Sequence, residues 1–469
     1  MVVSAACSGL GNGLQTISPL AHLHIFTLLI AFEYLILGFG KSLFGHFCTF
    51  CTTVIIQSIG SVLGFAGAVT QDEDTGQALG YALSVGLVQW FLLTFFALYL
   101  HYAFMSKFPK SILIPLVFPA AHTAVTMIVI GFSAGTFTAL GGAVLDYAPL
   151  RYVAVLFGLG GVHFTVVIAG TYAALCFMRY KKIPIQQMAV MSLCVLLLLL
   201  TCGAFLLQSG WFYQQGVSRH VTDTLPVSCV LGQEAAYGGV SYNQILNTTA
   251  DRARAGDSII LMSETAFKIT NSADEQSLLN TYTNRFALFT PDGSLAWNYR
   301  KSYPNPMTEY NVRPGQTDIP TTDAGGLLGK LGGAIGFDLD HPLYIHQAGL
   351  RAVDVMLQPV WTWQSMGPRH FDNNALRAIE NGFTLFRCSS DGVSGVISGR
   401  GAWGSVTSSQ TITGHDTAKP ALFQLPVGVR KLPKADGVLD RTFYVICGFA
   451  FDWIMLGFSV VVGVLTLFP

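Results

Sequence analysis

Charged side chains are scarce in this chain of 469 residues, where Asp, Glu, Lys and Arg make up 11% of the sequence. Soluble globular domains usually carry about 25% charged residues, whereas hydrophobic residues make up 51% of this chain. The formal net charge is zero and no run rich in Lys or Arg occurs, which excludes the basic surface of a nucleic-acid-binding protein. Such hydrophobicity also excludes an intrinsically disordered chain. The composition favours a protein that resides in lipid.

The few charges are unevenly distributed, since residues 1–208 carry 12 of the 52 charged residues. A helix that crosses a bilayer needs about 20 consecutive apolar residues. Runs of this length cover roughly 21–40, 47–69, 80–104, 111–133, 152–178, 187–208 and 443–468. We keep the first run as a span, because no Lys or Arg precedes Lys41 as a signal peptide would require. The pattern predicts a polytopic α-helical membrane bundle over 1–208 and a C-terminal transmembrane helix over 443–468.

The basic residues of the short loops indicate the orientation of this multi-pass integral membrane protein, because Lys and Arg are retained on the cytoplasmic side. The first, third and fifth loops hold Lys41, Lys107, Lys110, Arg179, Lys181 and Lys182. The second and fourth loops hold only Arg151. We therefore expect the N-terminus, and the polar region after the sixth run, to lie on the non-cytoplasmic side.

Between residues 210 and 440 short apolar strands alternate with amphipathic helices. Strands are predicted at 226–233, 258–262, 286–290, 295–301, 353–359, 383–388 and 393–398, with a further strand ending near Asp338. Helices are predicted at 242–255, 273–285, from Pro342, and at 368–381. The sequence Pro291-Asp292-Gly293 indicates a turn between two strands. This alternation predicts one layered α/β domain.

Cysteine is used sparingly, with nine in the chain. Cys48 and Cys51 form a C-x-x-C sequence, but no second pair and no His follow at zinc-binding spacing. We expect neither a metal nor a cofactor. Cys229 and Cys388 are the two cysteines of the polar region, where a disulfide between them stays open.

Polar motifs stand where three of the predicted strands end, which is where layered α/β domains place their sites. Glu264 follows the strand SIILM, and Lys301 ends the strand at 295–301 with Glu309 eight residues beyond it. Gly336 and Asp338 close a third strand. Taken singly, each charge is typical of a solvated surface, so only the order and spacing of these residues indicate a functional site.

In that order these residues resemble the nitrilase, or carbon-nitrogen hydrolase, superfamily, whose catalytic set is a Glu, a Lys and a Cys along the chain. Glu264 precedes Thr-Ala as the family's Glu does, Lys301 follows Tyr-x, and Glu309 falls at the family's second Glu. The segment 336–342 (GFDLDHP) resembles the family's nucleophile loop, with Gly336 at the position of the Cys. The membrane spans on both sides resemble those of the apolipoprotein N-acyltransferases within this superfamily. The resemblance implies a nitrilase-like αββα domain over residues 210–440.

The resemblance also implies nucleophilic acyl transfer, in which a thiolate attacks a carbonyl, a carboxylate takes the thiol proton and an ammonium stabilises the oxyanion. The implied partners are a membrane phospholipid, as acyl donor or as ligand, and a lipidated protein or peptide. Gly336 has no side chain and cannot form a thioester. Ser263 and the pair Met307-Thr308 are milder departures from the family pattern.

Three alternatives follow from Gly336. The chain is an acyltransferase or amidase that uses an unusual nucleophile or a water activated by Glu264, or it is a pseudoenzyme that binds a lipid or acylated peptide without turnover. A third alternative is that Gly336 is an engineered substitution or a sequencing change. Cys388 is a weak substitute nucleophile, because strand alternation predicts a core thiol there. The chemistry favours the pseudoenzyme, and the resemblance favours the enzyme.

Overall fold

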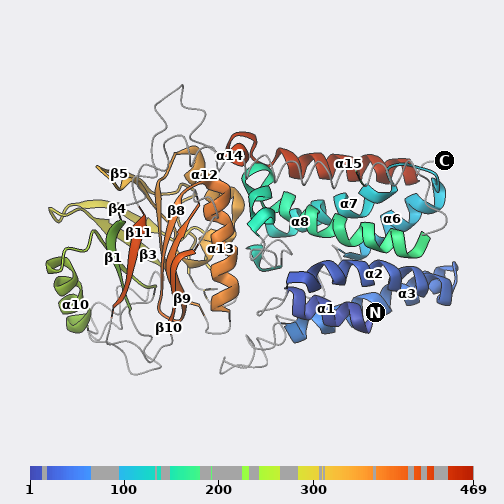
Figure 1. The fold of residues 1–469 in the computed structure, drawn as a ribbon, viewed down its shortest axis with the longest axis horizontal. Helices are drawn as coiled ribbons and strands as arrows, with labels where there is room; N and C mark the ends of the chain where they lie inside the picture. Colours follow the sequence, from blue (N-terminus) through green and yellow to red (C-terminus); the bar gives the residue numbers. More distant parts are fainter. Residues whose placement is uncertain are drawn as a thin grey trace. The chain divides into compact units, whose positions relative to one another are not determined.

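The computed structural model describes residues 1–12, 18–64, 94–131, 135–138, 148–179, 192, 224–231, 242–264, 284–305, 309, 312–362, 366–399, 406–412, 420–426 and 442–467. The chain divides into two compact units (Figure 1). One unit, here called the helical unit, comprises Met1–Leu206 and Cys447–Pro469, and the other, the α/β unit, comprises Leu207–Ile446.

The described part of the helical unit consists of α1 (Val2–Asn12), α2 (Ser18–Phe39), α3 (Leu43–Gly64), α6 (Phe96–Lys107), α7 (Ile114–Val129), α8 (Ala148–Arg179) and α15 (Ala450–Leu467), with a short 3-10 turn at Gly135–Thr138. Helix α1 packs against α2 and α3, and α7 packs against α6, α8 and α15. In α3 the hydroxyls of Thr49 and Thr53 donate to backbone carbonyls one turn earlier, which satisfies these polar groups within an apolar helix.

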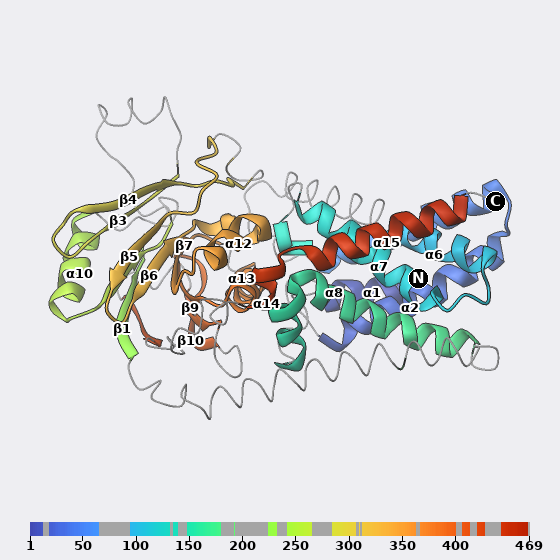
Figure 2. The same ribbon diagram turned by 90° about the horizontal axis from the view of Figure 1, so that it is seen from above.

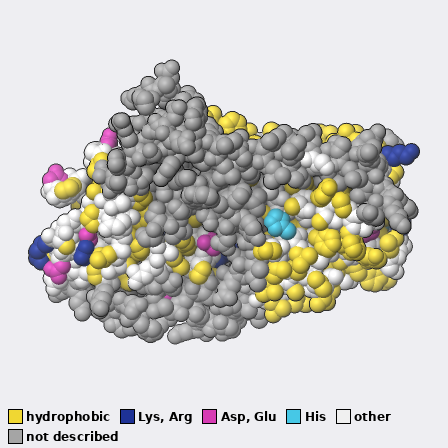
Figure 3. Space-filling model, viewed as in Figure 1, with side chains coloured by type: hydrophobic (Ala, Val, Ile, Leu, Met, Phe, Trp, Pro, Cys, Tyr) yellow, Lys and Arg dark blue, Asp and Glu magenta, His cyan; other side chains and the backbone are white. Residues whose placement is uncertain are grey.

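Four segments in the described part of this unit are long and apolar enough to cross a membrane: Pro19–Phe39, Leu43–Gly64, Val153–Met178 and Ala450–Leu467. Their outer faces carry exposed apolar side chains such as Leu43 and Trp453, and hydrophobic side chains cover much of this unit's described surface in Figure 3. Several long apolar helices are thus compatible with a membrane protein.

The helical predictions are right in part. Helices α2, α3, α6, α7 and α8 lie on predicted runs, whereas 65–69, 80–93 and all but one residue of 187–208 are outside the described residues. Helix α1 was not predicted, because its Gly and Ser residues break up the apolar run. The closing span is not one helix. Helix α14 (Phe443–Cys447) ends at Cys447, and the next residue, Gly448, has a φ of 59° and turns the chain before α15.

The α/β unit contains three sheets in its described part. Their strands are β1 (Thr224–Val230), β2 (Ile259–Met262), β3 (Arg285–Phe289), β4 (Leu295–Arg300), β5 (Thr321–Gly325), β6 (Gly329–Gly333), β7 (Val355–Val360), β8 (Thr384–Ser389), β9 (Gly392–Ser398), β10 (Val406–Ile412) and β11 (Ala421–Pro426). The strand orders are β11-β1-β2, β10-β9-β8-β7-β6-β5 and β3-β4. Strands β6, β7 and β8 run parallel, as do β1 and β2, so their carboxyl ends share one edge of each sheet.

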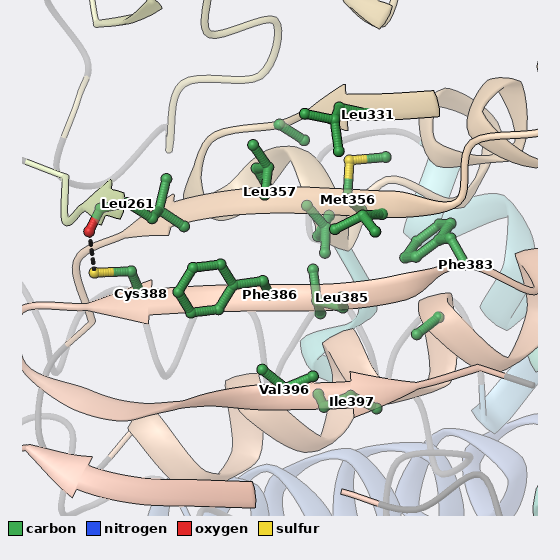
Figure 4. Packing of buried hydrophobic residues seen from close by; sticks show 14 of the residues in the cluster. Leu261, Leu331, Met356, Leu357, Phe383, Leu385, Phe386, Cys388, Val396 and Ile397 are labelled. Atoms are coloured by element: carbon green, nitrogen blue, oxygen red, sulfur yellow. Dashed lines mark hydrogen bonds between the residues drawn. The ribbon is translucent and has the colours of Figure 1, made fainter. Parts of the chain in front are cut away.

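Four layers form this unit (Figures 1 and 2). Helix α10 (Tyr242–Arg254) packs on β1 and β2, these strands face β8 and β7 of the six-stranded sheet, and α13 (Gly367–Asn381) packs on β8 and β9. Helix α12 (Pro342–Leu350) precedes β7. The core lies where the sheets face each other, and Figure 4 shows Leu261 of β2 beside Phe386 and Cys388 of β8.

Most strand and helix predictions of this unit are confirmed to within a few residues. One prediction that concerns the candidate site is wrong. The strand predicted to end near Asp338 ends at Gly333, and Gly336–Asp340 forms the 3-10 turn η7. Strands β5, β10 and β11 were not predicted, because Thr, Ser, Asp and Gly dominate β5 and β10 and remove the apolar signal there. The predicted helix at 273–285 lies outside the described residues except for its last two, of which Arg285 begins β3.

Candidate active site

The four predicted site positions lie at the ends of three strands or shortly after them. Glu264 follows β2, Lys301 follows β4, and Gly336 opens η7 after β6. The side chains of Glu264 and Lys301 are buried, at 8% and 3% exposure. The Lys301 backbone is fixed on both sides, because its N–H donates to Asn284 and its carbonyl accepts from Gly315. The fold therefore brings charged groups into an interior that normally excludes them.

One ammonium group lies between two carboxylates. Lys301 Nζ is 2.7 Å from Glu264 Oε1 and 2.6 Å from Glu309 Oε2. Asn284 Nδ2 bridges the two acids, because it donates to Glu264 Oε1 and, over 2.8 Å, to Glu309 Oε1. Burial opposes the charge on Lys301, but Glu264 and Glu309 raise the pKa of its ammonium well above the ordinary value. Lys301 therefore remains a cation at neutral pH.

Backbone groups fix the remaining carboxylate oxygens. The N–H of Trp361, just after β7, donates to Glu264 Oε2 over 3.0 Å. The N–H of Asn305 donates to Glu309 Oε2 over 2.7 Å. Each carboxylate thus accepts from Lys301, from an amide side chain and from the backbone, which defines its orientation.

Gly336 faces this ion pair directly. Its φ is +43°, in the left-handed region of backbone conformation that residues with a side chain rarely adopt. A Cβ built on Gly336 would lie 2.6 Å from Glu264 Oε2 and 3.3 Å from Lys301 Nζ. Any side chain at this position would therefore point at the carboxylate and the ammonium. Glu264, Lys301 and Gly336 converge on one point, and Glu309 joins them through Lys301.

Asp338 ties the Gly336 turn to the end of β4. Its Oδ2 accepts from the hydroxyl of Tyr299 over 2.7 Å and from the N–H of Ile335 over 2.9 Å, and its Oδ1 accepts from the N–H of Tyr303 over 2.8 Å. Burial raises the pKa of Asp338 to about 7. We did not predict this role from the sequence, although Asp338 lies in the segment that resembles the nucleophile loop.

A second set of buried polar groups holds Gly336 from the side of the six-stranded sheet. Gln358 Nε2 donates to the Gly336 carbonyl over 3.0 Å, and Arg387 Nη1 donates to Gln358 Oε1 over 3.1 Å. Arg387 Nη2 is 3.2 Å from His370 Nδ1, whose Nε2 is 2.8 Å from Asp340 Oδ2. Because Arg can only donate, Nδ1 of His370 accepts and Nε2 carries the proton. Sequence reasoning missed this set.

Burial lowers the pKa of His370, although Asp340 partly offsets that effect, so the imidazole stays neutral. The set begins at the Gly336 carbonyl and ends at Asp340, so it contacts both ends of η7. We call Gln358, Arg387 and His370 the brace of η7.

Cys388 is not the core thiol that strand alternation predicted. It forms a disulfide with Cys229, which answers the question that the sequence left open. A disulfide sulfur is not a nucleophilic thiolate, so Cys388 cannot serve as a thiolate while the bond is intact. Among the residues that the structure describes, no group of three or more His, Cys, Asp or Glu side chains is placed to hold a metal ion.

Comparisons with known proteins give a family for this region. The family model described as Carbon-nitrogen hydrolase matches residues 243–407. No curated protein matches the chain.

Solved structures give weaker likenesses. An amidase from Nesterenkonia sp. is 17% identical, with 43% of this chain and 90% of that chain covered and a TM-score of 0.34. A Saccharomyces cerevisiae protein, Nit3, described as a member of branch 10 of the nitrilase superfamily, is also 17% identical, with 43% and 90% covered and a TM-score of 0.31. At these scores the likenesses carry no argument, and the assignment depends on the family match. The C-terminal half of the chain contains a carbon-nitrogen hydrolase domain, matched over residues 243–407.

Proposed function

We propose that this chain is a multi-pass membrane protein, similar to the apolipoprotein N-acyltransferases, whose domain lies on the non-cytoplasmic side and binds a lipid or acylated peptide without covalent turnover. One observation carries the proposal: the residue that faces Glu264 and Lys301 is Gly336, with φ +43° and no side chain. The four long apolar segments and the Lys and Arg bias of the loops support the membrane assignment.

Covalent acyl transfer needs a side-chain atom that can form a thioester or ester at the Gly336 turn. Gly336 supplies none, and Cys388 is held in a disulfide. A water at this point would need Glu264 as its base, but this carboxylate accepts from Lys301, Asn284 and Trp361. Oε1 of Glu264 already accepts two of these hydrogen bonds and Oε2 accepts the third, so a water would have to compete with protein donors for this carboxylate. The site is therefore better suited to binding than to turnover.

The third N–H donor of Lys301 indicates which chemical group of a ligand this site would bind. An ammonium has three N–H donors, and Lys301 directs two of them to Glu264 and Glu309. The Cβ position of Gly336 lies 3.3 Å from Nζ, so a ligand oxygen next to Gly336 would be within reach of the third donor. An ester or amide carbonyl fits this arrangement, because it accepts a hydrogen bond and carries no charge. The acyl groups of phospholipids and lipidated peptides contain such carbonyls.

The test is to incubate the purified chain in detergent with phospholipid that carries an isotope-labelled acyl chain. We expect mass spectrometry to find the lipid bound without covalent attachment and no acylated residue. A covalent adduct on any side chain, or a labelled product transferred to an amine, would overturn the proposal in favour of a Glu264-assisted enzyme.

The variant Gly336→Cys is the informative partner of this experiment. It places a thiol beside Glu264 and Lys301 at a cost in stability, because the added Cβ lies 2.6 Å from Glu264 Oε2, and we expect the molecules that fold to acquire the labelled acyl group. The matched control combines Gly336→Cys with Lys301→Met, which removes the oxyanion donor and should abolish the adduct.

A further inference from the structure

A disulfide joins the two facing sheets of the α/β unit. Cys229 lies near the carboxyl end of β1 and Cys388 near the carboxyl end of β8, 159 residues later in the chain. Both residues are fully buried. Cys388 Sγ also lies 3.2 Å from the carbonyl oxygen of Leu261 in β2, as Figure 4 shows. The covalent link therefore sits at the same edge of the sheets as the candidate site.

The disulfide lies next to a hydrogen bond that crosses the same interface. On one side, the residue after Cys229, Val230, accepts the N–H of Ser263, and Glu264 follows directly. On the other side, Cys388 pairs in register with Pro359 of β7, two residues before Trp361. Trp361 N–H donates to Glu264 Oε2. The covalent bond and this hydrogen bond are thus neighbouring links between the same two sheets.

We propose that the Cys229–Cys388 disulfide is a clamp that fixes the spacing of the two sheets at the candidate site and keeps the hydrogen bond between Trp361 and Glu264 closed. Without the bond, the two sheets are joined at this edge by side-chain packing and by the contact between Glu264 and Trp361. That hydrogen bond then opens more often. The effect on ligand affinity depends on the proposed function, whereas the clamp itself does not.

Burial indicates when the bond forms. Thiol–disulfide exchange needs access to the sulfur atoms, and these two are inaccessible in the folded domain, so the clamp is set during folding and does not act as a reversible switch. The Cys229 thiolate attacks a disulfide oxidant, RSSR, and releases one RSH. The Cys388 thiolate then attacks the Cys229 sulfur of the mixed disulfide and releases the second RSH. The two RSH molecules together carry away the two electrons and the two thiol protons.

Such an oxidant is found in the oxidising compartments outside the cytosol. The clamp therefore agrees with the non-cytoplasmic placement that the loop charges predict, from an independent observation.

The first experiment tests the bond itself. The full chain is denatured in iodoacetamide without reductant, digested and mapped by mass spectrometry. We expect Cys229 and Cys388 in one linked peptide pair, while Cys447, a free and exposed thiol, is alkylated. Alkylation of both Cys229 and Cys388 would overturn the proposal.

The second experiment tests the clamp through residue-resolved hydrogen exchange, a measurement that needs no ligand. In the double variant Cys229→Ala/Cys388→Ala, we expect the Trp361 amide to exchange at least tenfold faster. The Thr384 amide, which donates to Asp354 at the opposite end of β8, should be unchanged. Cys447→Ala serves as the matched control and should change neither amide.

Two results would contradict a local clamp. An unchanged Trp361 amide would show that the disulfide does not hold the site, and loss of protection throughout the domain, Thr384 included, would show a global role instead. Lipid binding is measured in parallel on the same variants. If the wild-type chain binds no lipid while Trp361 behaves as expected, the proposed function fails and the clamp stands.

Discussion

Gly336 allows the sharpest test of the site geometry, because the substitution Gly336→Ala adds a single methyl group at the point where the charged residues converge. The added Cβ would meet Glu264 Oε2 at 2.6 Å, which is closer than a carbon and a carboxylate oxygen can approach. The backbone at φ +43° is also unfavourable for Ala. We expect both effects to lower the free energy of unfolding.

The magnitude can be estimated for each effect. A residue with a side chain in the left-handed region costs about 1–2 kcal/mol relative to Gly. If the methyl group displaces the Glu264 carboxylate, Trp361 loses a hydrogen bond to a charged acceptor, which is worth about 1.5–3 kcal/mol. The total is about 2.5–5 kcal/mol, a large share of the stability of an ordinary domain.

Gly293 supplies the matched control. It lies in the exposed turn between β3 and β4, its φ is +84°, and a Cβ built there meets nothing within 4 Å. Gly293→Ala should therefore cost only the backbone contribution of about 1–2 kcal/mol. Urea unfolding of the detergent-solubilised chain, followed by tryptophan fluorescence, measures both variants. Equal losses for the two variants would refute the placement of Glu264 against Gly336.

Three further predictions concern other charged and packed positions. Burial raises the pKa of Asp338 from 3.8 to about 7. The contribution of Asp338 to the free energy of unfolding is therefore complete below about pH 4 and is lost as the pH rises through 7. In urea titrations from pH 5 to 8, Asp338→Asn should flatten this decline. Lys301→Met leaves the buried Glu264 and the half-buried Glu309 carboxylates without a counter-charge and should cost about 3–5 kcal/mol in the same assay. Gly160→Ala would drive its methyl group into the Asp452 carboxylate between α8 and α15 and should lower the melting temperature of the helical unit, whereas Gly457→Ala, which meets nothing within 4 Å, should not.

The strands that carry the site could be predicted because their apolar runs are short and end in polar residues. Ser258–Met262 and Leu295–Lys301 contain such runs, and β2 and β4 lie on them. The convergence of Glu264 and Lys301 with Gly336 could be expected only from the resemblance to the nitrilase superfamily. Spacing along one strand does not tell which strands from other sheets lie opposite.

The brace of η7 could not be predicted, for a physical reason. Gln358 and Arg387 are single polar residues within the buried strands β7 and β8, and His370 is one of many polar residues of α13. A polar residue in a buried strand costs free energy unless it finds partners, and those partners come from elements that are distant in the sequence. The disulfide was left open for the same reason, since its cysteines lie 159 residues apart.

The presence of Glu264, Lys301 and Glu309 does not by itself indicate turnover. Removing one partner from a buried ion pair costs about 3–5 kcal/mol, because the other charge remains buried without compensation. Two carboxylates and one ammonium, together with Asn284, form such a set here. Loss of Lys301 or of either acid would therefore destabilise the domain whether or not it catalyses a reaction. Gly336 carries no comparable penalty, since a residue without a side chain best tolerates φ +43° beside Glu264. The stability of the domain thus accounts for the charged residues, and only the residue at position 336 distinguishes binding from covalent acyl transfer.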